Sequence, residues 1–236
     1  MASSDAGTRY QLSAVEGTGV ANLRRLGLTT EVGSPDSEEM AAFRDLAISG
    51  HAPQNKGGVP LNIASTDHVI RQMSIVEFLG YVDLIRKLPR LKKMNMHPPH
   101  RQWVDEGQTS GQQGDYGLMI DGIRQIARAA ARWGIEIVLE NNEVDWSRIA
   151  DHVPADQADW TDSNVSFGTS PEEWVQICVD VGRPNVALCL DTRHACSYAH
   201  TLADPERRTE VVMAFVARPE LIRHVHWKES YLHDTR

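Results

Sequence analysis

The chain has 236 residues, of which 41% are hydrophobic and 24% are charged, and its formal net charge at pH 7 is −8. This composition is typical of a globular protein, and the length is enough for one large domain, so we expect residues 1–236 to form a single domain. The acidic balance disfavours nonspecific binding to nucleic acid.

Short apolar segments alternate with longer amphipathic segments along the chain, which is the pattern of a parallel sheet covered by helices. Seven strands are predicted, at residues 10–15, 28–33, 46–51, 91–97, 135–141, 186–191 and 222–227. Six helices are predicted, at residues 22–27, 37–45, 74–88, 118–134, 170–182 and 204–217. Two further segments, 53–73 and 142–169, show no clean pattern and follow strand ends, so they are expected to be loops.

Two of the helices carry clear end signals. The helix over 118–134 closes with Gly134 directly before an apolar run, as expected for a helix C-cap that leads into a strand. The helix over 170–182 begins at Ser170 and Pro171, which is typical of an N-cap followed by a proline-led first turn. These signals support the alternation of strands and helices.

Seven or eight such units favour a (β/α)₈ TIM barrel of the α/β class over a doubly wound sheet. Neither a G-x-G-x-x-G nor a G-x-x-x-x-G-K-[ST] motif follows any strand, which removes the main reason to prefer a nucleotide-binding fold. Because only seven strands are counted before Arg236, we expect the barrel to lack its last strand. An edge of the sheet would then be open. Residues 1–9 are expected to be flexible.

The sequence shows no targeting or membrane segment. Residues 1–11 lack a basic start and an apolar run, and no stretch approaches the roughly 20 apolar residues of a membrane span. The three cysteines are an odd set, and Cys178 and Cys189 lie within apolar runs, so they are expected to be buried thiols rather than disulfide partners. A cytoplasmic protein is therefore expected.

Each predicted strand after the first ends at a residue type that binds metals. These residues are Glu31, His51, His97, Glu140, Asp191 with His194 just beyond it, and His226. In a TIM barrel the catalytic groups gather at the carboxyl ends of the strands. The strand ends are therefore the predicted site.

Alternation along the strands supports this prediction. Asp191 shares one strand face with Ala187 and Cys189, while the bulkier residues between them take the other face. His97 likewise lies opposite Met96. The polar residues would thus face the barrel lumen together.

Several carboxylates and imidazoles buried at one point are costly unless a cation neutralises them. The set contains oxygen and nitrogen ligands but no thiolate. Such a set suits Mn²⁺, Zn²⁺ or Co²⁺, and Mg²⁺ less well because of the imidazoles. The sequence therefore predicts a divalent metal site.

Five segments, in this order and spacing, resemble the xylose isomerase-like TIM barrel superfamily. They are HAPQN, NMHPP, IVLENN, VALCLDTRHA and RHVHWKES. The superfamily includes sugar phosphate isomerases and epimerases as well as zinc-dependent abasic-site endonucleases. The resemblance covers roughly residues 28–236.

In the epimerase branch, the resemblance implies one metal ion held by a Glu, an Asp, a His and a second Glu. The first three correspond to Glu140, Asp191 and His226, and Mn²⁺ is the expected ion, with Zn²⁺ or Co²⁺ as alternatives. The second Glu would lie beyond Arg236, or a residue such as Glu229 or Asp234 would take its place. The implied activity is a sugar, sugar phosphate or polyol isomerase or epimerase that removes a proton next to a carbonyl through a metal-stabilised enediolate.

The resemblance also implies roles for the other site residues. Glu140 would act as a catalytic acid or base. His194 would bind substrate or handle protons, and His51 and His97 would line the substrate pocket. The expected partner is a small sugar or polyol rather than nucleic acid or a membrane, and barrels of this group often pair as homo-oligomers.

Two alternative functions remain open on the sequence. The set His51, His97, Glu140, Asp191, His194 and His226 also fits the multi-zinc site of the abasic-site endonucleases, although the acidic balance and the lack of a basic stripe disfavour that reading. The chain could also be a metal-binding subunit of a multi-subunit lyase that acts on glycosides. The tryptophan-bearing segment from Val144 to Trp160 would then contact a partner or cover an active site.

Overall fold

The computed structural model describes residues 19–33, 42–103, 112–146, 153, 157 and 165–228. The predicted strand at 10–15 and most of the predicted helix at 37–45 lie outside these residues. The other six predicted strands are confirmed, and they form one sheet.

All neighbouring strands of this six-stranded sheet run parallel, and their order in space follows the order in the chain. The strands are β1 (Thr30–Val32), β2 (Ala47–His51), β5 (Lys93–Met96), β8 (Glu136–Glu140), β9 (Val186–Asp191) and β10 (Ile222–His226). Parallel neighbours in sequence order, joined by helices, are the repeating unit of a β/α barrel.

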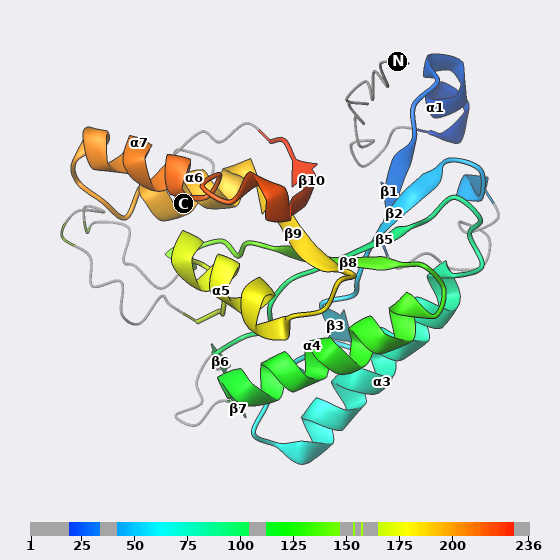
Figure 1. The fold of residues 1–236 in the computed structure, drawn as a ribbon, viewed down its shortest axis with the longest axis horizontal. Coiled ribbons are helices and arrows are strands. Elements are labelled where there is room, and N and C mark those ends of the chain that lie inside the picture. Colours follow the sequence, from blue (N-terminus) through cyan, green and yellow to red (C-terminus); the bar gives the residue numbers. More distant parts are fainter. Residues whose placement is uncertain are drawn as a thin grey trace, which may run out of the picture.

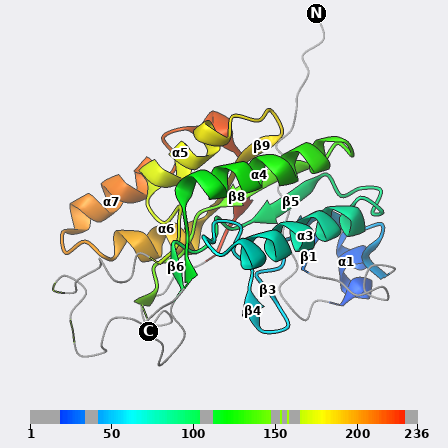
Figure 2. The ribbon, with the colours of Figure 1, turned by 90° about the horizontal axis from the view of Figure 1, so that it is seen from below.

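The described helices are α1 (Val20–Leu26), α3 (His68–Ile85), α4 (Tyr116–Ala131), α5 (Pro171–Val181), α6 (Thr192–Ala199) and α7 (Pro205–Ala214), followed by a short 3₁₀ turn at Pro219–Leu221. Helices α3, α4 and α5 cover the outer face of the sheet, and α7 packs on α5 and α6 (Figure 1). Figure 2 shows α3, α4 and α5 side by side across the strands. Within the described part of the chain, no helix is long and apolar enough to cross a membrane.

The sheet curls strongly, although β1 and β10 stand at its opposite edges. In a flat sheet these edges would lie about 24 Å apart, because neighbouring strands are about 4.8 Å apart. Instead the carboxylate of Glu31 on β1 lies 3.0 Å from the imidazole of His226 on β10. The six strands therefore form most of a barrel wall around a narrow interior.

The two faces of the sheet differ as the alternation predicted. Met96 and Leu188 belong to the large core between the strands and the helices. The inner face carries a separate small cluster of Val138, Ala187 and Cys189. Trp174 of α5 is fully buried, and its indole Nε1 donates to the carbonyl of Leu139 at 2.8 Å, which holds α5 against β8 just before the end of that strand.

Two hairpins, the start of one helix and one further helix differ from the sequence predictions. The segment 53–73 was expected to be a loop, but it contains a hairpin of β3 (Asn55–Lys56) and β4 (Val59–Pro60) and the first turns of α3. A second small hairpin pairs β6 (Gln102–Trp103) with β7 (Gln112–Gln113). Helix α6 was not predicted, because its eight residues follow a strand without a turn between them.

The predicted cap of α5 is confirmed and can be tested. The Ser170 hydroxyl accepts a hydrogen bond from the backbone N–H of Glu173 at 3.3 Å, and Pro171 is the first helical residue. Replacing Ser170 by alanine is expected to lower the free energy of unfolding by about 1 kcal/mol, measured by urea denaturation. Ser170→Asn should retain most of the stability, since asparagine caps equally well. An equal loss in both variants would show that the lost stability does not come from the cap.

Candidate metal centre

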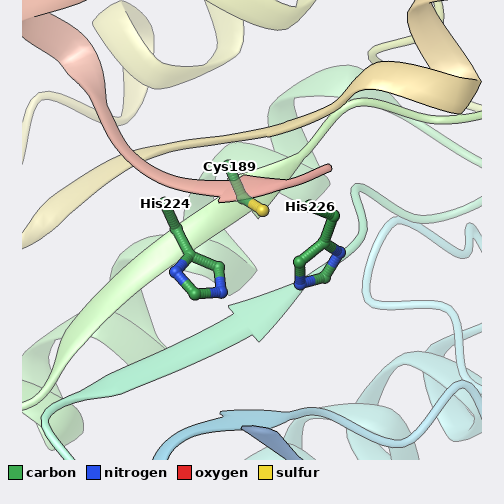
Figure 3. A group of neighbouring side chains, drawn as sticks. All are labelled: Cys189, His224 and His226. Atoms are coloured by element: carbon green, nitrogen blue, oxygen red, sulfur yellow. The ribbon is translucent and has the colours of Figure 1, made fainter. Parts of the chain in front are cut away.

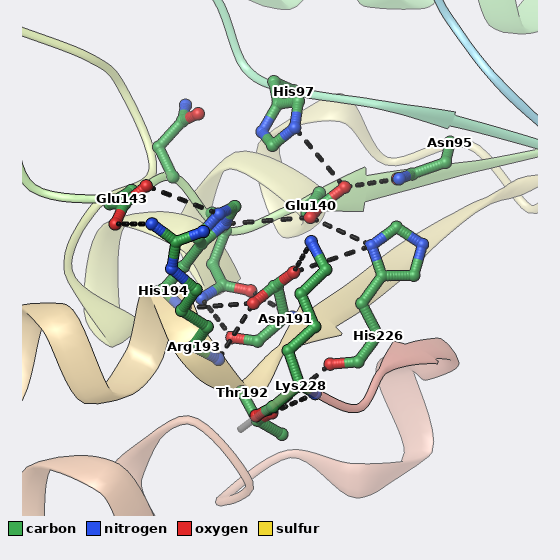
Figure 4. A network of polar contacts seen from close by, with 12 residues as sticks. Asn95, His97, Glu140, Glu143, Asp191, Thr192, Arg193, His194, His226 and Lys228 are labelled. Carbon is green, nitrogen blue, oxygen red and sulfur yellow. Dashed lines mark hydrogen bonds and ion pairs between the residues drawn. The ribbon is translucent and has the colours of Figure 1, made fainter. Parts of the chain in front are cut away.

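The carboxyl ends of β8, β9 and β10 bring three predicted metal ligands together (Figure 4). One ligand atom each of Glu140, Asp191 and His226 lies within 4.8 Å of the others. Glu140 and Asp191 are almost fully buried, and His226 is only 9% exposed. Residues 35 to 86 positions apart in the sequence thus converge at one buried point.

Glu140 is the centre of the cluster. Its Oε2 accepts a hydrogen bond from the side-chain amide of Asn95 and lies 3.4 Å from Nε2 of both His51 and His97. Its Oε1 lies 3.0 Å from Nδ1 of His226. Burial raises the pKa of this carboxyl, but the imidazoles of His97, His226 and His51 more than offset that effect and hold the pKa below its usual range. Glu140 is therefore a carboxylate at neutral pH.

The two oxygens of Asp191 have separate partners. Oδ1 caps helix α6 by accepting the backbone N–H groups of Arg193 at 2.9 Å and His194 at 3.1 Å. Oδ2 faces the cluster, 3.7 Å from Nδ1 of His226 and 2.8 Å from the ammonium of Lys228. Burial raises the pKa of Asp191, but contacts with His226, His194 and Lys228 lower it by more, so the pKa lies below its usual value. One oxygen thus holds the helix while the other remains directed at the site.

His226 has a carboxylate at each ring nitrogen. Nδ1 lies 3.0 Å from Glu140, and Nε2 lies 3.0 Å from Glu31. Burial alone lowers the pKa of His226, but hydrogen bonds to Asp191, Glu140 and Glu31 raise it to about 11. Without a metal ion this ring therefore carries a proton on both nitrogens and supplies positive charge to a cluster of carboxylates.

His51 and His97 lie beside the cluster, and their role in lining a substrate pocket stays a prediction. Their ring centroids are 5.3 Å apart, and His51 donates its Nδ1–H to the carbonyl of Ala52 at 3.0 Å, which leaves Nε2 for Glu140. Burial lowers the pKa of His97 to about 4, so its imidazole is neutral at neutral pH. Burial also lowers the pKa of His51, but the neighbouring carboxylate of Glu140 raises it by more, so the pKa of His51 lies above its usual value. Both rings can accept hydrogen bonds or bind a cation when neutral.

His194 lies in the first turn of α6, next to the cluster. Its Nδ1 lies 2.8 Å from the carbonyl of Asn141, and since a carbonyl only accepts, Nδ1 carries the hydrogen. Its Nε2 lies 3.9 Å from a carboxylate oxygen of Glu143. The ring is 9% exposed and is therefore mostly covered. This arrangement suits a residue that exchanges protons or hydrogen bonds with a bound molecule.

Five residues near the site were not predicted as site residues. They are Asn95, Asn141, Glu143, Arg193 and Lys228. Asn141 joins the ends of β8 and β9, because its side chain both accepts from the N–H of Asp191 and donates to the carbonyl of Asp191. Lys228 follows His226 by two residues, so strand alternation was a signal that could have found it. Arg193 and Glu143 form an ion pair that no sequence pattern indicated.

The residues fit a divalent metal ion. Two carboxylates and one imidazole within 4.8 Å form a suitable oxygen and nitrogen ligand set, and a second group of His51, His97 and Glu140 meets the same distance limit. The buried carboxylates of Glu140 and Asp191 and the half-buried carboxylate of Glu31 all contact the imidazole of His226, and a cation would neutralise this concentration of negative charge.

Residues 35–236 match the family of xylose isomerase-like TIM barrels. This match covers most of the chain, so the protein belongs to that family. The family predicted from the sequence is therefore confirmed, and the curled parallel sheet is the corresponding barrel wall. No protein of curated function matches the chain.

Solved structures of sugar epimerases have the same fold. A D-psicose 3-epimerase determined with D-fructose superposes with a TM-score of 0.60 at 22% identity, covering 89% of this chain and 66% of that one. The 3-keto-D-glucoside 4-epimerase of E. coli superposes with a TM-score of 0.59 at 15% identity, covering 93% of this chain and 77% of that one. The chain spans about two-thirds of the length of the D-psicose 3-epimerase. At these identities the likeness shows the fold alone.

Proposed function

We propose that this protein is a divalent-metal-dependent isomerase or epimerase that acts on a sugar, sugar phosphate or polyol. The observation that carries the proposal is the convergence of Glu140, Asp191 and His226, with their ligand atoms within 4.8 Å. The sugar epimerases among the structural neighbours support the substrate class. Mn²⁺ is the proposed ion, and the free cysteines agree with the reducing cytoplasm as its location.

Glu140, Asp191 and His226 would hold the metal ion, which when bound supplies a Lewis acid that polarises a substrate carbonyl. Glu140 is ionised and buried, so it is the proposed base that takes a proton from the carbon next to that carbonyl. His194 holds its Nδ1 against the carbonyl of Asn141, which leaves Nε2 for the substrate, and it is the proposed proton carrier. His51 and His97 would bind substrate hydroxyls and exclude water from the reacting carbon.

The function is tested by proton exchange. The purified chain, loaded with Mn²⁺, is incubated in heavy water with a panel of ketoses, sugar phosphates and keto-polyols. We expect deuterium to enter one substrate at the carbon next to its carbonyl, and removal of the metal with a chelator to stop the exchange. A chain that binds the metal yet catalyses no exchange across the panel would contradict the proposal.

The second ligand group favours one alternative function. His51, His97 and Glu140 could hold a further ion beside the first, with Glu140 shared, which is the arrangement of a multi-zinc phosphodiesterase. That function predicts two or more zinc ions per chain and cleavage of DNA at abasic sites. The net charge of −8 disfavours it, because phosphate binding needs a basic surface.

Lys228 competes with the proposed metal ion for Asp191. Its ammonium lies 2.8 Å from Oδ2, and its side chain is 49% exposed. Replacing Lys228 by methionine is expected to raise the affinity for Mn²⁺ about fivefold, because a partly exposed ion pair contributes roughly 1 kcal/mol. Titration calorimetry measures this affinity. Arg193→Met is the matched control, since Arg193 pairs with Glu143 instead; an equal gain in both variants would mean that only overall charge matters.

A further inference from the structure

The side chain of Glu31 lies inside the curled sheet although its strand is at the far edge. Glu31 is 11% exposed, and both of its oxygens meet imidazoles. Oε1 lies 3.0 Å from Nε2 of His226, and Oε2 lies 3.2 Å from Nε2 of His224. Residue 31 also precedes the part of the chain that matches the family. Neither the family match nor the ligand group therefore assigns a role to Glu31.

The contact to His226 uses the nitrogen that points away from the proposed ligands. Nδ1 of His226 faces Glu140 and Asp191, while Nε2 faces Glu31. In neutral imidazole only one nitrogen carries hydrogen, and the partner of that nitrogen decides which one it is. A carboxylate only accepts hydrogen bonds, so once Glu140 and Asp191 bind the ion, Glu31 is the carboxylate that keeps a hydrogen on Nε2. Nδ1 is then the nitrogen that can bind a cation.

His224 holds Glu31 in place. The two imidazoles project from the same face of β10, with Cys189 of β9 beside them (Figure 3). Their ring centroids are 5.1 Å apart. A buried carboxylate is costly unless both of its oxygens have partners. His226 contacts Oε1 of Glu31, and His224 contacts Oε2. The chain of contacts from His224 through Glu31 to His226 therefore ends at the proposed metal ligands.

We propose that Glu31 is a positioning residue of the metal centre, which fixes the tautomer and the ring orientation of His226 so that Nδ1 binds the ion. Metal-binding histidines commonly donate their second ring N–H to a carboxylate in this way, and loss of that carboxylate typically costs 10-fold to 100-fold in metal affinity. This inference rests on the metal centre of the proposed function. It adds a residue that the ligand set does not contain.

The first experiment uses the unaltered protein loaded with Zn²⁺ and labelled with ¹⁵N at histidine. We expect the His226 resonances to show Nδ1 bound to the ion and Nε2 carrying hydrogen. Nε2 bound to the ion would overturn the inference. Loading with Co²⁺ gives a second readout, because a thiolate-to-cobalt charge-transfer band would place the ion on Cys189 with His224 and His226, and would also overturn it.

The second experiment measures Zn²⁺ affinity by competition with a chromophoric chelator. Glu31→Gln is expected to weaken binding about tenfold or more, and His224→Asn about threefold, because His224 acts only through Glu31. Glu136→Gln is the matched control. Glu136 is the first residue of β8, at the end of the strand away from Glu140, so this variant should leave the Zn²⁺ affinity unchanged. Circular dichroism of each metal-free variant checks its fold.

The outcomes separate this inference from the proposed function. If the unaltered chain binds Zn²⁺ and Glu31→Gln binds it equally well, Glu31 has no positioning role and only the inference fails. If the unaltered chain binds no divalent ion, the proposed function fails as well. A folded Glu31→Gln variant with weakened binding and an altered His226 tautomer supports the inference, since a merely structural role would not change the tautomer.

Discussion

Replacing Glu140 by glutamine is expected to weaken metal binding at least about a hundredfold and to lower the rate of substrate proton exchange by about a thousandfold or more. The substitution keeps the shape of the side chain but removes its negative charge. Both oxygens of Glu140 lie among imidazoles, 3.0 Å from His226 and 3.4 Å from His51 and His97, so a neutral amide cannot replace the charge there. The base and one metal ligand would be lost together.

Metal affinity by calorimetry and deuterium incorporation by NMR measure the two effects. Glu143→Gln is the matched control: Glu143 lies three residues further on and pairs with Arg193, and it belongs to none of the three groups of candidate ligands found among the described residues. It should leave metal affinity nearly unchanged. A Glu140→Gln variant that binds Mn²⁺ as tightly as the unaltered chain would show that the cluster is not the metal centre.

Substitution of Asp191 is expected to separate metal binding from helix capping. In Asp191→Asn the side-chain oxygen still accepts the N–H groups of Arg193 and His194, but the charge that faces His226 is lost. We therefore expect a loss of metal affinity of about a hundredfold with α6 intact. Asp191→Ala removes the cap as well, and should lower the free energy of unfolding by about 1 kcal/mol relative to Asp191→Asn.

Both variants are compared by metal titration and by urea denaturation without metal. The capping role predicts that only the alanine variant loses the additional stability. If the asparagine variant binds metal normally, Asp191 is a capping residue without a role in the metal centre. If the two variants are equally stable, the hydrogen bonds from Asp191 to the first turn of α6 contribute nothing measurable to folding.

The strands and the inward-facing residues could be predicted because they follow a local pattern. Side chains alternate along a strand, so the position of Cys189 placed Asp191 on the same inner face, and Met96 placed His97 opposite the helix-covered core. This pattern requires no knowledge of which strands are neighbours. Strand alternation alone therefore predicts which side chains face the candidate site.

The short elements could not be predicted in the same way. Helix α6 begins at Thr192, immediately after β9, so no loop residues mark its start. The only local signal was Asp191 itself, which we interpreted as a metal ligand rather than an N-cap, and the structure gives it the capping role through Oδ1. The segment from Val144 to Trp160 lies mostly outside the described residues, so its proposed contact with a partner or cover over an active site stays a prediction; at its described start, Trp146 is buried and donates to Ser197 at 2.7 Å.

The sequence by itself determined the alternation of strands and helices, the family, and the residue types at the strand ends, because each of these depends on short-range spacing. The tertiary structure alone decided which of those residues meet. Glu31 and His224 are 193 positions apart, and their contact exists only because the sheet curls until its two edges face each other. Curvature is a property of the whole sheet that depends on the summed twist and packing of its strands, and no single segment encodes it.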